Sequence, residues 1–282
     1  MQWNVGAIKI TKVVELELTG HTRFILPQAT PEAVRDIAWL CPAFADADGR
    51  LKMSIHCFLV ETPRRRIIVD TGLGNDKEGR VVPRWNRLQS GFLEAITAAG
   101  YPPETIDTVL LTHLHVDHVG WNTRLVAGRW VPTFARARYL MERVEFEHWR
   151  RRDHPAQAVV FEDSIQPILD AGLAELIADD HRVCEEIRVI PAPGHSPGHL
   201  CVEITSGGET VLLAGDVMHH PCQMAHLGWS STADFDAAQA DRTRRALLER
   251  LAGTAVLMLG GHFTGPGGGR VVRDGERFRL EG

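Results

Sequence analysis

Short apolar runs recur along the chain, several with alternating apolar and polar positions, and predict β-strands. They cover residues 7–18, 56–60, 66–69, 108–112, 188–190, 200–204, 211–214 and 255–259. Apolar residues at helical spacing predict helices over 86–99, 137–149, 164–177 and 233–251. Gly100 follows the first helix where a left-handed cap would sit, and Ser231 and Thr232 are N-cap candidates for the last. This alternation is typical of an α/β fold in which helices cover sheet faces.

Length and composition agree with an ordinary globular protein. The chain has 282 residues, of which 44% are hydrophobic and 24% charged. A chain of this length buries enough surface to fold without a metal or disulfide. A metal site is therefore expected to serve function rather than folding. No linker or low-complexity stretch divides the sequence, so we expect a single domain over residues 1–282.

Charge and segment lengths narrow the choice of partners and location. The formal net charge of −5 gives no general attraction to nucleic acid or anionic lipid. The apolar runs are far shorter than the roughly 20 residues of a spanning helix. The first residues carry no basic or apolar export signal, and the five scattered cysteines suit reduced thiols. We expect a soluble cytoplasmic protein without nucleic-acid or membrane partners.

Residues 113–118 read His-Leu-His-Val-Asp-His directly after the predicted strand 108–112. Alternate residues of an extended segment share a face, so His113, His115 and Asp117 can point the same way. His118 can join them if the chain turns after Asp117, as Gly120 suggests. Imidazole and carboxylate groups are ligands for Zn²⁺ and similar divalent ions. The segment therefore predicts part of a metal site.

Three later predicted strands each run through glycine into a side chain that can bind metal. The residues reached are His195 after Gly194, Asp216 after Gly215, and His262 after Gly261. Glycine permits the tight turn that such a strand end needs. The repetition is expected if several strands of one scaffold end around a common site. We therefore expect these side chains to share a metal site with the 113–118 loop.

This series of motifs, together with Asp70-Thr71-Gly72 after an earlier strand, resembles the metallo-β-lactamase superfamily of hydrolases. The resemblance spans about residues 56–262 and implies an αβ/βα four-layer sandwich with the metals at one edge of the sheets. It implies that Asp70 supports a ligand, and we expect His199 to do the same or to lie in the core. By position, the first metal would be held by His113, His115 and His195, the second by Asp117, His118 and His262, and Asp216 would bridge them.

Seven ligand side chains suit two divalent ions roughly 3.5–4 Å apart with a bridging water. We expect zinc, with manganese and iron as alternatives. Coordination lowers the pKa of water from 15.7 to about 7, so the expected nucleophile is a metal-bridging hydroxide. Asp117 and Asp216 are expected to pass a proton to the leaving group. The predicted reaction is hydrolysis of a lactone or another carboxylic ester, a small-molecule substrate.

The third residue after Asp216 is His219. Quorum-signal lactonases, one family that the chain resembles, carry there a tyrosine that assists at the substrate oxygen. Histidine at this place resembles the methyl parathion hydrolase branch, so phosphotriesters and aryl esters are alternative substrates. A histidine can donate a hydrogen bond to a developing oxyanion. The competing interpretation places His219 at the rim of the site without a role in turnover.

Two other function classes remain as alternatives. A phosphodiesterase or nuclease of the same superfamily needs a basic path for the nucleic-acid backbone. The arginine clusters at 64–66, 150–152 and 242–245 are the candidates, although a solvated face is the simpler explanation of each. A metal-stabilised interaction protein without turnover is the other class, which the complete ligand set disfavours.

Four tryptophans lie in segments of irregular pattern. Exposed aromatic residues there would line an apolar acyl or aryl pocket, or else form the surface of a homodimer. These residues are Trp85, Trp121, Trp130 and Trp229.

Overall fold

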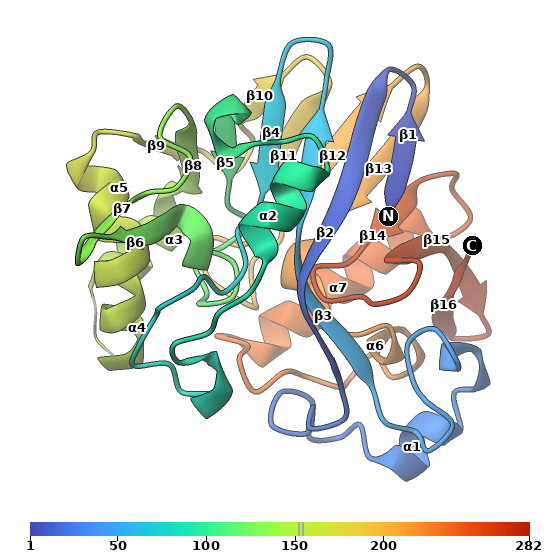
Figure 1. Ribbon diagram of the computed structural model, residues 1–282. Coiled ribbons are helices and arrows are strands. Elements are labelled where there is room, and N and C mark those ends of the chain that lie inside the picture. Colours follow the sequence, from blue (N-terminus) through green and yellow to red (C-terminus); the bar gives the residue numbers. More distant parts are fainter. Residues whose placement is uncertain (152, 154) are drawn as a thin grey trace. The chain divides into compact units, whose positions relative to one another are not determined.

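The computed structural model describes residues 1–282 except 152 and 154. It divides into two compact units. The first comprises Met1–Leu16 and Ile55–Asp179, and the second comprises Glu17–Ser54 and Asp180–Gly282. Each unit contains a seven-stranded sheet and helices (Figure 1), which confirms the expected α/β class. The single domain predicted over 1–282 depends on how the units associate and stays a prediction.

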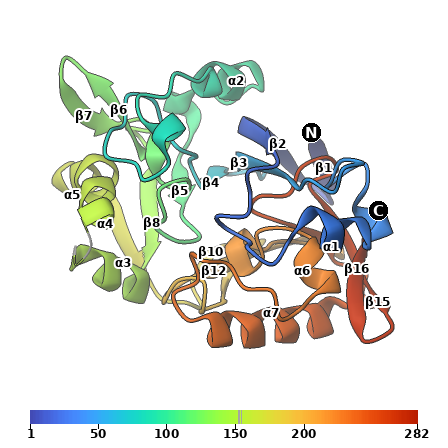
Figure 2. The same cartoon turned by 90° about the horizontal axis from the view of Figure 1, so that it is seen from below.

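The sheet of the first unit has the strand order β1-β2-β3-β4-β5-β8-β9. Its strands are β1 (Gln2–Val5), β2 (Ile8–Thr19), β3 (Lys52–Glu61), β4 (Arg66–Val69), β5 (Thr108–Leu110), β8 (Arg138–Glu142) and β9 (Ala174–Ile177). A separate hairpin joins β6 (Thr123–Val126) to β7 (Arg129–Pro132). The α-helices are α2 (Phe92–Ala98), α3 (Arg143–Arg150), α4 (Pro155–Val160) and α5 (Gln166–Asp170). Helix α3 packs beside β8 and β9 (Figure 2).

Parallel pairing in the first unit directs several strand ends to one edge. Strands β4, β5 and β8 pair in parallel, so their carboxyl ends lie at the same edge of the sheet. Asp70 follows β4 directly, and His113 comes three residues after β5. Ligands of open α/β sheets commonly bind outside these carboxyl ends. A buried apolar core that includes Ile68, Val109 and Tyr139 holds the strands in place.

The sheet of the second unit has the order β10-β11-β12-β13-β14-β15-β16. Its strands are β10 (Arg182–Cys184), β11 (Ile187–Pro191), β12 (Leu200–Ser206), β13 (Glu209–Leu213), β14 (Leu257–Leu259), β15 (Gly268–Asp274) and β16 (Arg277–Glu281). The helices are α1 (Pro31–Arg35), α6 (Cys222–Ala225) and α7 (Ala237–Leu251). Helix α7 packs beside β15. This unit has its own apolar core, which includes Leu212, Leu248 and Met258.

The prediction of a helix over 137–149 is wrong in its first half. Residues 138–142 form β8, and only Arg143–Arg150 are helical. Tyr139, Leu140 and Met141 are all buried, so both faces of β8, a strand inside the sheet, are covered. A strand buried on both faces shows a continuous apolar run, which periodicity does not distinguish from a buried helix. Glu142 then starts α3, since its carboxylate accepts the backbone N–H of Glu145 at 2.7 Å.

Other helices differ mainly at their starts. Residues 164–177 contain the end of a π-helix (Phe161–Ile165), then α5 and β9, instead of one helix. Helix α2 begins at Phe92, and Gly100 adopts the expected left-handed conformation after it, with φ of 96°. Helix α7 begins at Ala237 with Asp236 as its N-cap, so the N-caps predicted at Ser231 and Thr232 are wrong.

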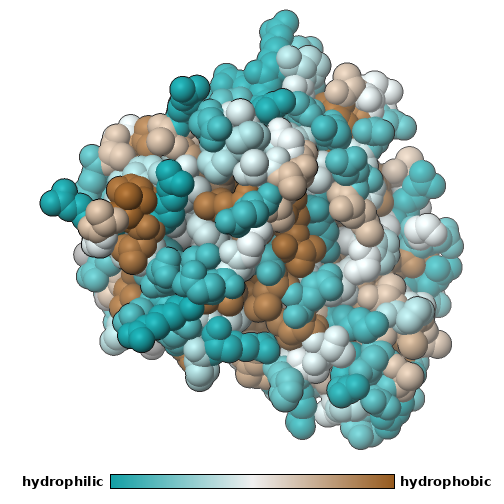
Figure 3. Space-filling view, viewed as in Figure 1, coloured by the Kyte–Doolittle hydropathy of each residue, from teal (hydrophilic) through white to brown (hydrophobic). Residues whose placement is uncertain are grey.

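The visible surface mixes hydrophilic and apolar side chains (Figure 3). Among the described residues, the exposed large apolar side chains include Val81, Leu125 and Phe235. None of the described helices combines the length and apolar character required to cross a membrane.

Candidate metal centre

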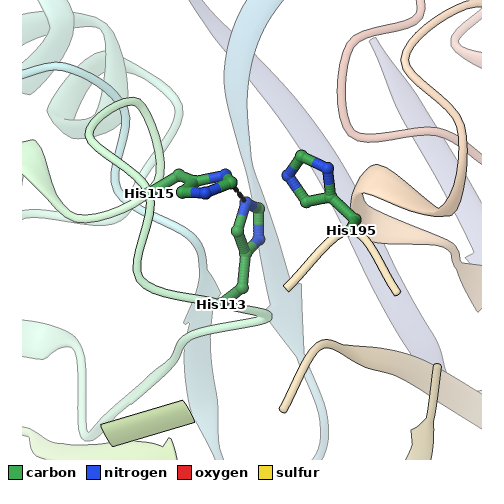
Figure 4. A group of neighbouring side chains, drawn as sticks. All are labelled: His113, His115 and His195. Atoms are coloured by element: carbon green, nitrogen blue, oxygen red, sulfur yellow. Dashed lines mark hydrogen bonds between the residues drawn. The ribbon is translucent and has the colours of Figure 1, made fainter. Parts of the chain in front are cut away.

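The 113–118 loop of the first unit brings its candidate ligands together. His113 Nε2 lies 3.0 Å from His115 Nδ1, and Figure 4 shows these two side chains next to each other. The rings of His113 and His118 are 4.1 Å apart between centroids. His118 Nε2 lies 3.8 Å from Asp117 Oδ1. The loop therefore gathers four candidate metal ligands at the carboxyl end of β5.

Asp70 holds this loop from the end of β4. Its Oδ2 lies 2.9 Å from His118 Nδ1, and its Oδ1 accepts the backbone N–H of Thr112 at 2.8 Å. A carboxylate on one ring nitrogen orients a metal-binding histidine and directs the other nitrogen to the ion. Asp70 has a φ of 59°, in the left-handed region that turns the chain sharply after β4. These contacts agree with the supporting role expected for Asp70.

Two glutamates that the sequence analysis missed, buried Glu145 and half-buried Glu15, contact segments near this loop. Glu145 Oε1 accepts the backbone N–H of Leu114 at 3.0 Å, between the first two histidines of the motif. Glu15 accepts the backbone N–H of Leu73 at 2.5 Å and the indole N–H of Trp121 at 2.7 Å. Burial raises the pKa of Glu15. Glu15 lies within an apolar run, which was an available signal, whereas no such pattern marks Glu145.

Asp216 is the centre of a cluster in the second unit. Its Oδ2 lies 3.0 Å from His262 Nε2, 3.4 Å from His219 Nε2 and 3.6 Å from His195 Nε2. The candidate ligand atoms of His195, Asp216 and His219 all lie within 4.8 Å of one another. All four residues are buried. The strand–glycine–ligand pattern therefore predicted three members of a real cluster.

The topology of the second sheet explains this convergence. Strand β12 pairs antiparallel with both β11 and β13, and β13 pairs in parallel with β14. Strands β11, β13 and β14 therefore run in the same direction. The candidate ligands that follow them, His195, Asp216 and His262, lie at the carboxyl ends of these strands, at one edge of the sheet. Glycine is required at Gly261, because a Cβ there would lie 2.5 Å from Asp216 Oδ1.

The other ring nitrogens of two histidines face oxygen atoms. His195 Nδ1 lies 3.0 Å from Asp234 Oδ1, on the loop before α7, and Figure 4 shows the turn that carries His195. His262 Nδ1 lies 3.0 Å from the backbone oxygen of Ser54. Both arrangements direct Nε2 towards Asp216 and are typical of metal-binding histidines. Imidazoles around a carboxylate match the donors that divalent zinc prefers, so these residues fit a metal ion.

His219 and His199 occupy different places around Asp216. His219 is buried within the cluster, which argues against a position at the rim. Burial lowers the pKa of His219 to about 3, although Asp216 acts in the opposite direction. His199 Nε2 instead accepts the backbone N–H of Asp216 at 2.8 Å. This contact agrees with the expectation that His199 supports a ligand.

Asp234 was missed by the sequence analysis, and its contact with His195 leads to a prediction. Asp234→Asn is expected to weaken metal binding 10- to 100-fold, because a neutral amide orients the imidazole less strongly than a carboxylate. Competition with a chromogenic chelator measures this affinity. Asp236→Asn is the matched control, since asparagine also caps helices well. Equal metal affinity in the two variants would show that Asp234 does not support His195 as a ligand.

A small apolar pocket lies in the first unit beside His115. Its volume is about 110 Å³, and its lining includes Trp85, one of the four tryptophans predicted to form such a pocket, and Trp149. The other three have different surroundings. Trp121 is buried in the core, the ring of Trp130 lies 3.7 Å below Lys77 Nζ, and Trp229 stacks on His226.

Lys77 is a buried lysine whose lowered pKa predicts a pH-dependent stability. Burial lowers this pKa from 10.5 to about 7, while Asp163 acts in the opposite direction. Between these values the unfolded chain binds more protons than the folded chain, so stability rises with pH, by up to about 1.4 kcal/mol per pH unit. Urea unfolding between pH 7 and 9 is expected to show this rise in the wild type relative to Lys77→Met. Parallel pH dependences would contradict a neutral Lys77.

The arginine clusters considered for nucleic-acid binding have nearby carboxylate partners. Arg66 pairs with Glu61 at 3.1 Å, Arg150 with Glu147 at 2.6 Å and Arg245 with Asp241 at 2.8 Å. Arg152, part of the second cluster, lies outside the described residues. These ion pairs reduce the positive charge that the clusters offer to a phosphate backbone.

The curated relatives of the chain include proteins that are named as a lactonase and as a probable metallo-hydrolase. An N-acyl homoserine lactonase from Bacillus cereus is 27% identical over 176 residues, which cover 57% of this chain and 63% of the relative. A probable metallo-hydrolase from Mycobacterium tuberculosis is 29% identical over 180 residues, which cover 58% of this chain and 57% of the relative. The matches therefore span less than two thirds of either relative.

Solved structures and a family model agree on the fold. AidC, a dizinc quorum-quenching lactonase, superposes with a TM-score of 0.81 at 21% identity, over 100% of this chain and 97% of AidC. The hydrolase AbOPH of the beta-lactamase superfamily gives 0.80 at 24% identity, over 99% of this chain and 95% of that protein. At these identities the likeness shows the fold alone. Residues 52–277 match the family model of the metallo-beta-lactamase superfamily. The expected fold is confirmed, and the chain belongs to the metallo-beta-lactamase superfamily.

Proposed function

We propose that the chain is a dinuclear metal-dependent hydrolase that opens a lactone or cleaves another carboxylic ester. The observation that carries this proposal is the buried cluster of three histidines around Asp216, in which two imidazoles are held by oxygen atoms on their far side. Buried charged and polar groups are costly unless they are paired or bind metal. The lactonase and hydrolase names of the relatives support the same chemistry.

The proposed ligands are the seven side chains expected from the sequence. One ion would be held by His113, His115 and His195, the other by Asp117, His118 and His262, and Asp216 would contact both. When bound, two divalent ions polarise the scissile carbonyl and make water nucleophilic at neutral pH. Zinc is the proposed metal, because nitrogen and oxygen donors of this kind are its usual ligands, and manganese and iron are alternatives.

The protein's own groups would orient the reactants and move protons. Asp70, Asp234 and the Ser54 carbonyl fix the ring orientation of His118, His195 and His262. Asp117 and Asp216 are the proposed proton carriers towards the leaving group.

We assign a hydrogen-bonding role at the substrate oxygen to His219, whose neutral imidazole retains one N–H. His219→Phe is expected to lower kcat 100- to 1,000-fold, the usual cost of losing one oxyanion donor, with two metal ions retained. Steady-state kinetics and metal analysis of the same preparation measure both quantities. His226→Phe, a histidine whose ring stacks on Trp229, is the control. An unchanged kcat in His219→Phe would rule out this role.

A substrate panel tests the reaction class. The wild type is expected to hydrolyse an N-acyl homoserine lactone faster than a phosphotriester and faster than p-nitrophenyl acetate, which is an aryl ester. The alternative phosphotriester or aryl ester hydrolase is favoured by a histidine, instead of a tyrosine, three residues after Asp216. A preference for the phosphotriester or for p-nitrophenyl acetate would select that alternative. No hydrolysis of any of the three substrates by protein with two metal ions would contradict the proposed function.

A further inference from the structure

His219 is carried by a short buried segment without regular secondary structure. The segment follows a 3₁₀ turn over Gly215–Val217 and precedes the short helix α6. Residues 218–221 belong to neither element, and all of them are buried. Buried backbone N–H groups need hydrogen-bond partners, which the interior of a regular helix supplies from its own backbone. In this segment other groups have to supply them, and the positions of those groups decide where His219 points.

The side chain of Gln223 supplies such partners. Its Oε1 accepts the backbone N–H of His219 at 2.8 Å and that of His220 at 3.3 Å. Its Nε2 donates to the backbone oxygen of Trp229 at 2.9 Å. Gln223 is fully buried, and the two N–H donors and the carbonyl acceptor define which end of its carboxamide is oxygen. Gln223 therefore bonds directly to the peptide group from which the His219 side chain projects.

His220 fixes the residue next to His219. Its Nδ1 accepts the backbone N–H of Cys222 at 3.0 Å, so this nitrogen carries no hydrogen. Its Nε2 lies 2.8 Å from the backbone oxygen of Phe44, which can only accept, so Nε2 carries the hydrogen. Both ring nitrogens of His220 are thus bonded to the backbone. His219 is therefore the residue of this histidine pair that faces Asp216.

Arg244 of α7 holds the segment at two further points. Its guanidinium donates to the backbone oxygens of Val217 and Leu227, each at 3.3 Å, and Arg244 is fully buried. Buried polar networks add little net stability, but they favour a single conformation. Three buried polar side chains bonded to the backbone of residues 217–229 are therefore better explained by a defined position of this segment than by stability.

The segment places the His219 ring in the cluster around Asp216. His219 Nε2 lies 3.4 Å from Asp216 Oδ2, and the ring is within 7° of parallel to the ring of His262. A group that stabilises charge at a reacting oxygen acts through its direction as well as its distance. A misplacement of about 1 Å can lower a rate roughly 100-fold. Control of the backbone at His219 is therefore control of its proposed hydrogen bond.

We propose that Gln223 is a positioning residue, whose buried carboxamide holds the backbone of His219 so that the imidazole points towards the substrate oxygen. His220 and Arg244 support it by holding neighbouring parts of the same segment. This inference rests on the proposed function, which gives His219 its hydrogen-bonding role. Gln223 acts through the backbone of His219 and is not itself a proposed contact of the substrate.

The first test removes the carboxamide. Methionine fills nearly the same volume without hydrogen-bonding groups of comparable strength, so Gln223→Met is expected to fold. Its kcat for an N-acyl homoserine lactone is expected to fall about 10- to 100-fold with two metal ions retained. KM is expected to stay the same, because the bond from His219 strengthens in the transition state. Gln166→Met, which also removes a carboxamide that donates a hydrogen bond, is the control. Wild-type kcat in Gln223→Met would overturn the proposal.

Two further variants of Gln223 test the hydrogen bonds themselves. Gln223→Asn withdraws the carboxamide by one methylene group and is expected to lose as much rate as Gln223→Met, so it carries the test if the methionine variant does not fold. Gln223→Glu keeps an acceptor oxygen in place, and burial favours the neutral carboxyl group, which can donate to Trp229. This variant is expected to keep kcat close to the wild-type value at neutral pH. A loss in Gln223→Glu equal to that in Gln223→Asn would overturn the proposal.

A double-mutant cycle distinguishes positioning of His219 from a general structural effect. Once His219→Phe has removed the imidazole, the further change Gln223→Met has no hydrogen bond at the substrate oxygen left to misdirect. It is therefore expected to lower kcat by less than about twofold in this background. The same loss in both backgrounds would show that Gln223 acts independently of His219 and would overturn the proposal.

Nuclear magnetic resonance of the histidine rings separates this inference from the proposed function. In zinc-loaded protein with isotopically labelled histidine, the ring signals of His219 are identified by their loss in His219→Phe. Gln223→Met is expected to shift or double these signals, and Gln166→Met to leave them unchanged. If they shift but no ester is hydrolysed by the wild type, the proposed function fails and the contact between Gln223 and His219 stands. If esters are hydrolysed and the His219 signals are the same in Gln223→Met, the positioning role fails alone.

Discussion

Asp216→Ala is expected to reduce turnover at least about 1,000-fold and to lower the metal content from two ions per chain towards one. Loss of a residue that only supports a ligand typically costs 10- to 100-fold, and Asp216 is proposed to contact both ions directly. Its Oδ2 is the atom that faces the Nε2 atoms of His195, His219 and His262. Removing this carboxylate also leaves the three imidazoles without the acidic group that they surround.

Elemental analysis and kinetics on the same preparation measure both effects of Asp216→Ala. Asp180→Ala, in an exposed turn of the same unit, is the control for loss of a carboxylate. The account requires loss of metal together with loss of rate. Two ions per chain with wild-type turnover in Asp216→Ala would show that Asp216 is not the bridge.

Removal of the metal is expected to abolish hydrolysis while the protein stays folded. Each unit has its own buried apolar core, and a chain of this length folds without metal. After dialysis against a chelator, the far-UV circular dichroism spectrum is therefore expected to be unchanged, and the rate is expected to fall to background. Added zinc or manganese is expected to restore the rate.

Dialysis against a chelator that is already saturated with zinc is the control, because it exposes the protein to the chelator without removing metal. Turnover that persists when less than about one tenth of the sites hold metal would contradict metal-dependent hydrolysis. Unfolding of the metal-free protein would show that the ions are part of the core stability, contrary to the expectation from its size.

The elements that are visible in the sequence are those whose local pattern has one structural explanation. Strand β4 has the predicted bounds 66–69, and Gly100 caps α2 as expected. The repeated strand–glycine–ligand pattern identified Asp216 and His262 because a tight turn at a strand end leaves a local signature. All seven candidate ligands could therefore be proposed without coordinates.

The features that were missed depend on contacts between distant segments. Strand β8 looked helical because both of its faces are buried, which makes its apolar run continuous. Asp234 lies 39 residues after His195, and no local pattern indicates that their side chains meet. The buried ion pair of Arg80 and Asp163 is similar, since 83 residues separate the two partners. Such partners are set by the fold as a whole.

The most direct test of the central claim is anomalous X-ray diffraction from crystals of the metal-loaded protein, measured at the absorption edge of the bound metal. The account predicts two peaks per chain, each about 2.0–2.2 Å from imidazole nitrogens or carboxylate oxygens of the proposed ligands, with Asp216 reaching both. A single peak, or two peaks that do not share Asp216, would contradict it.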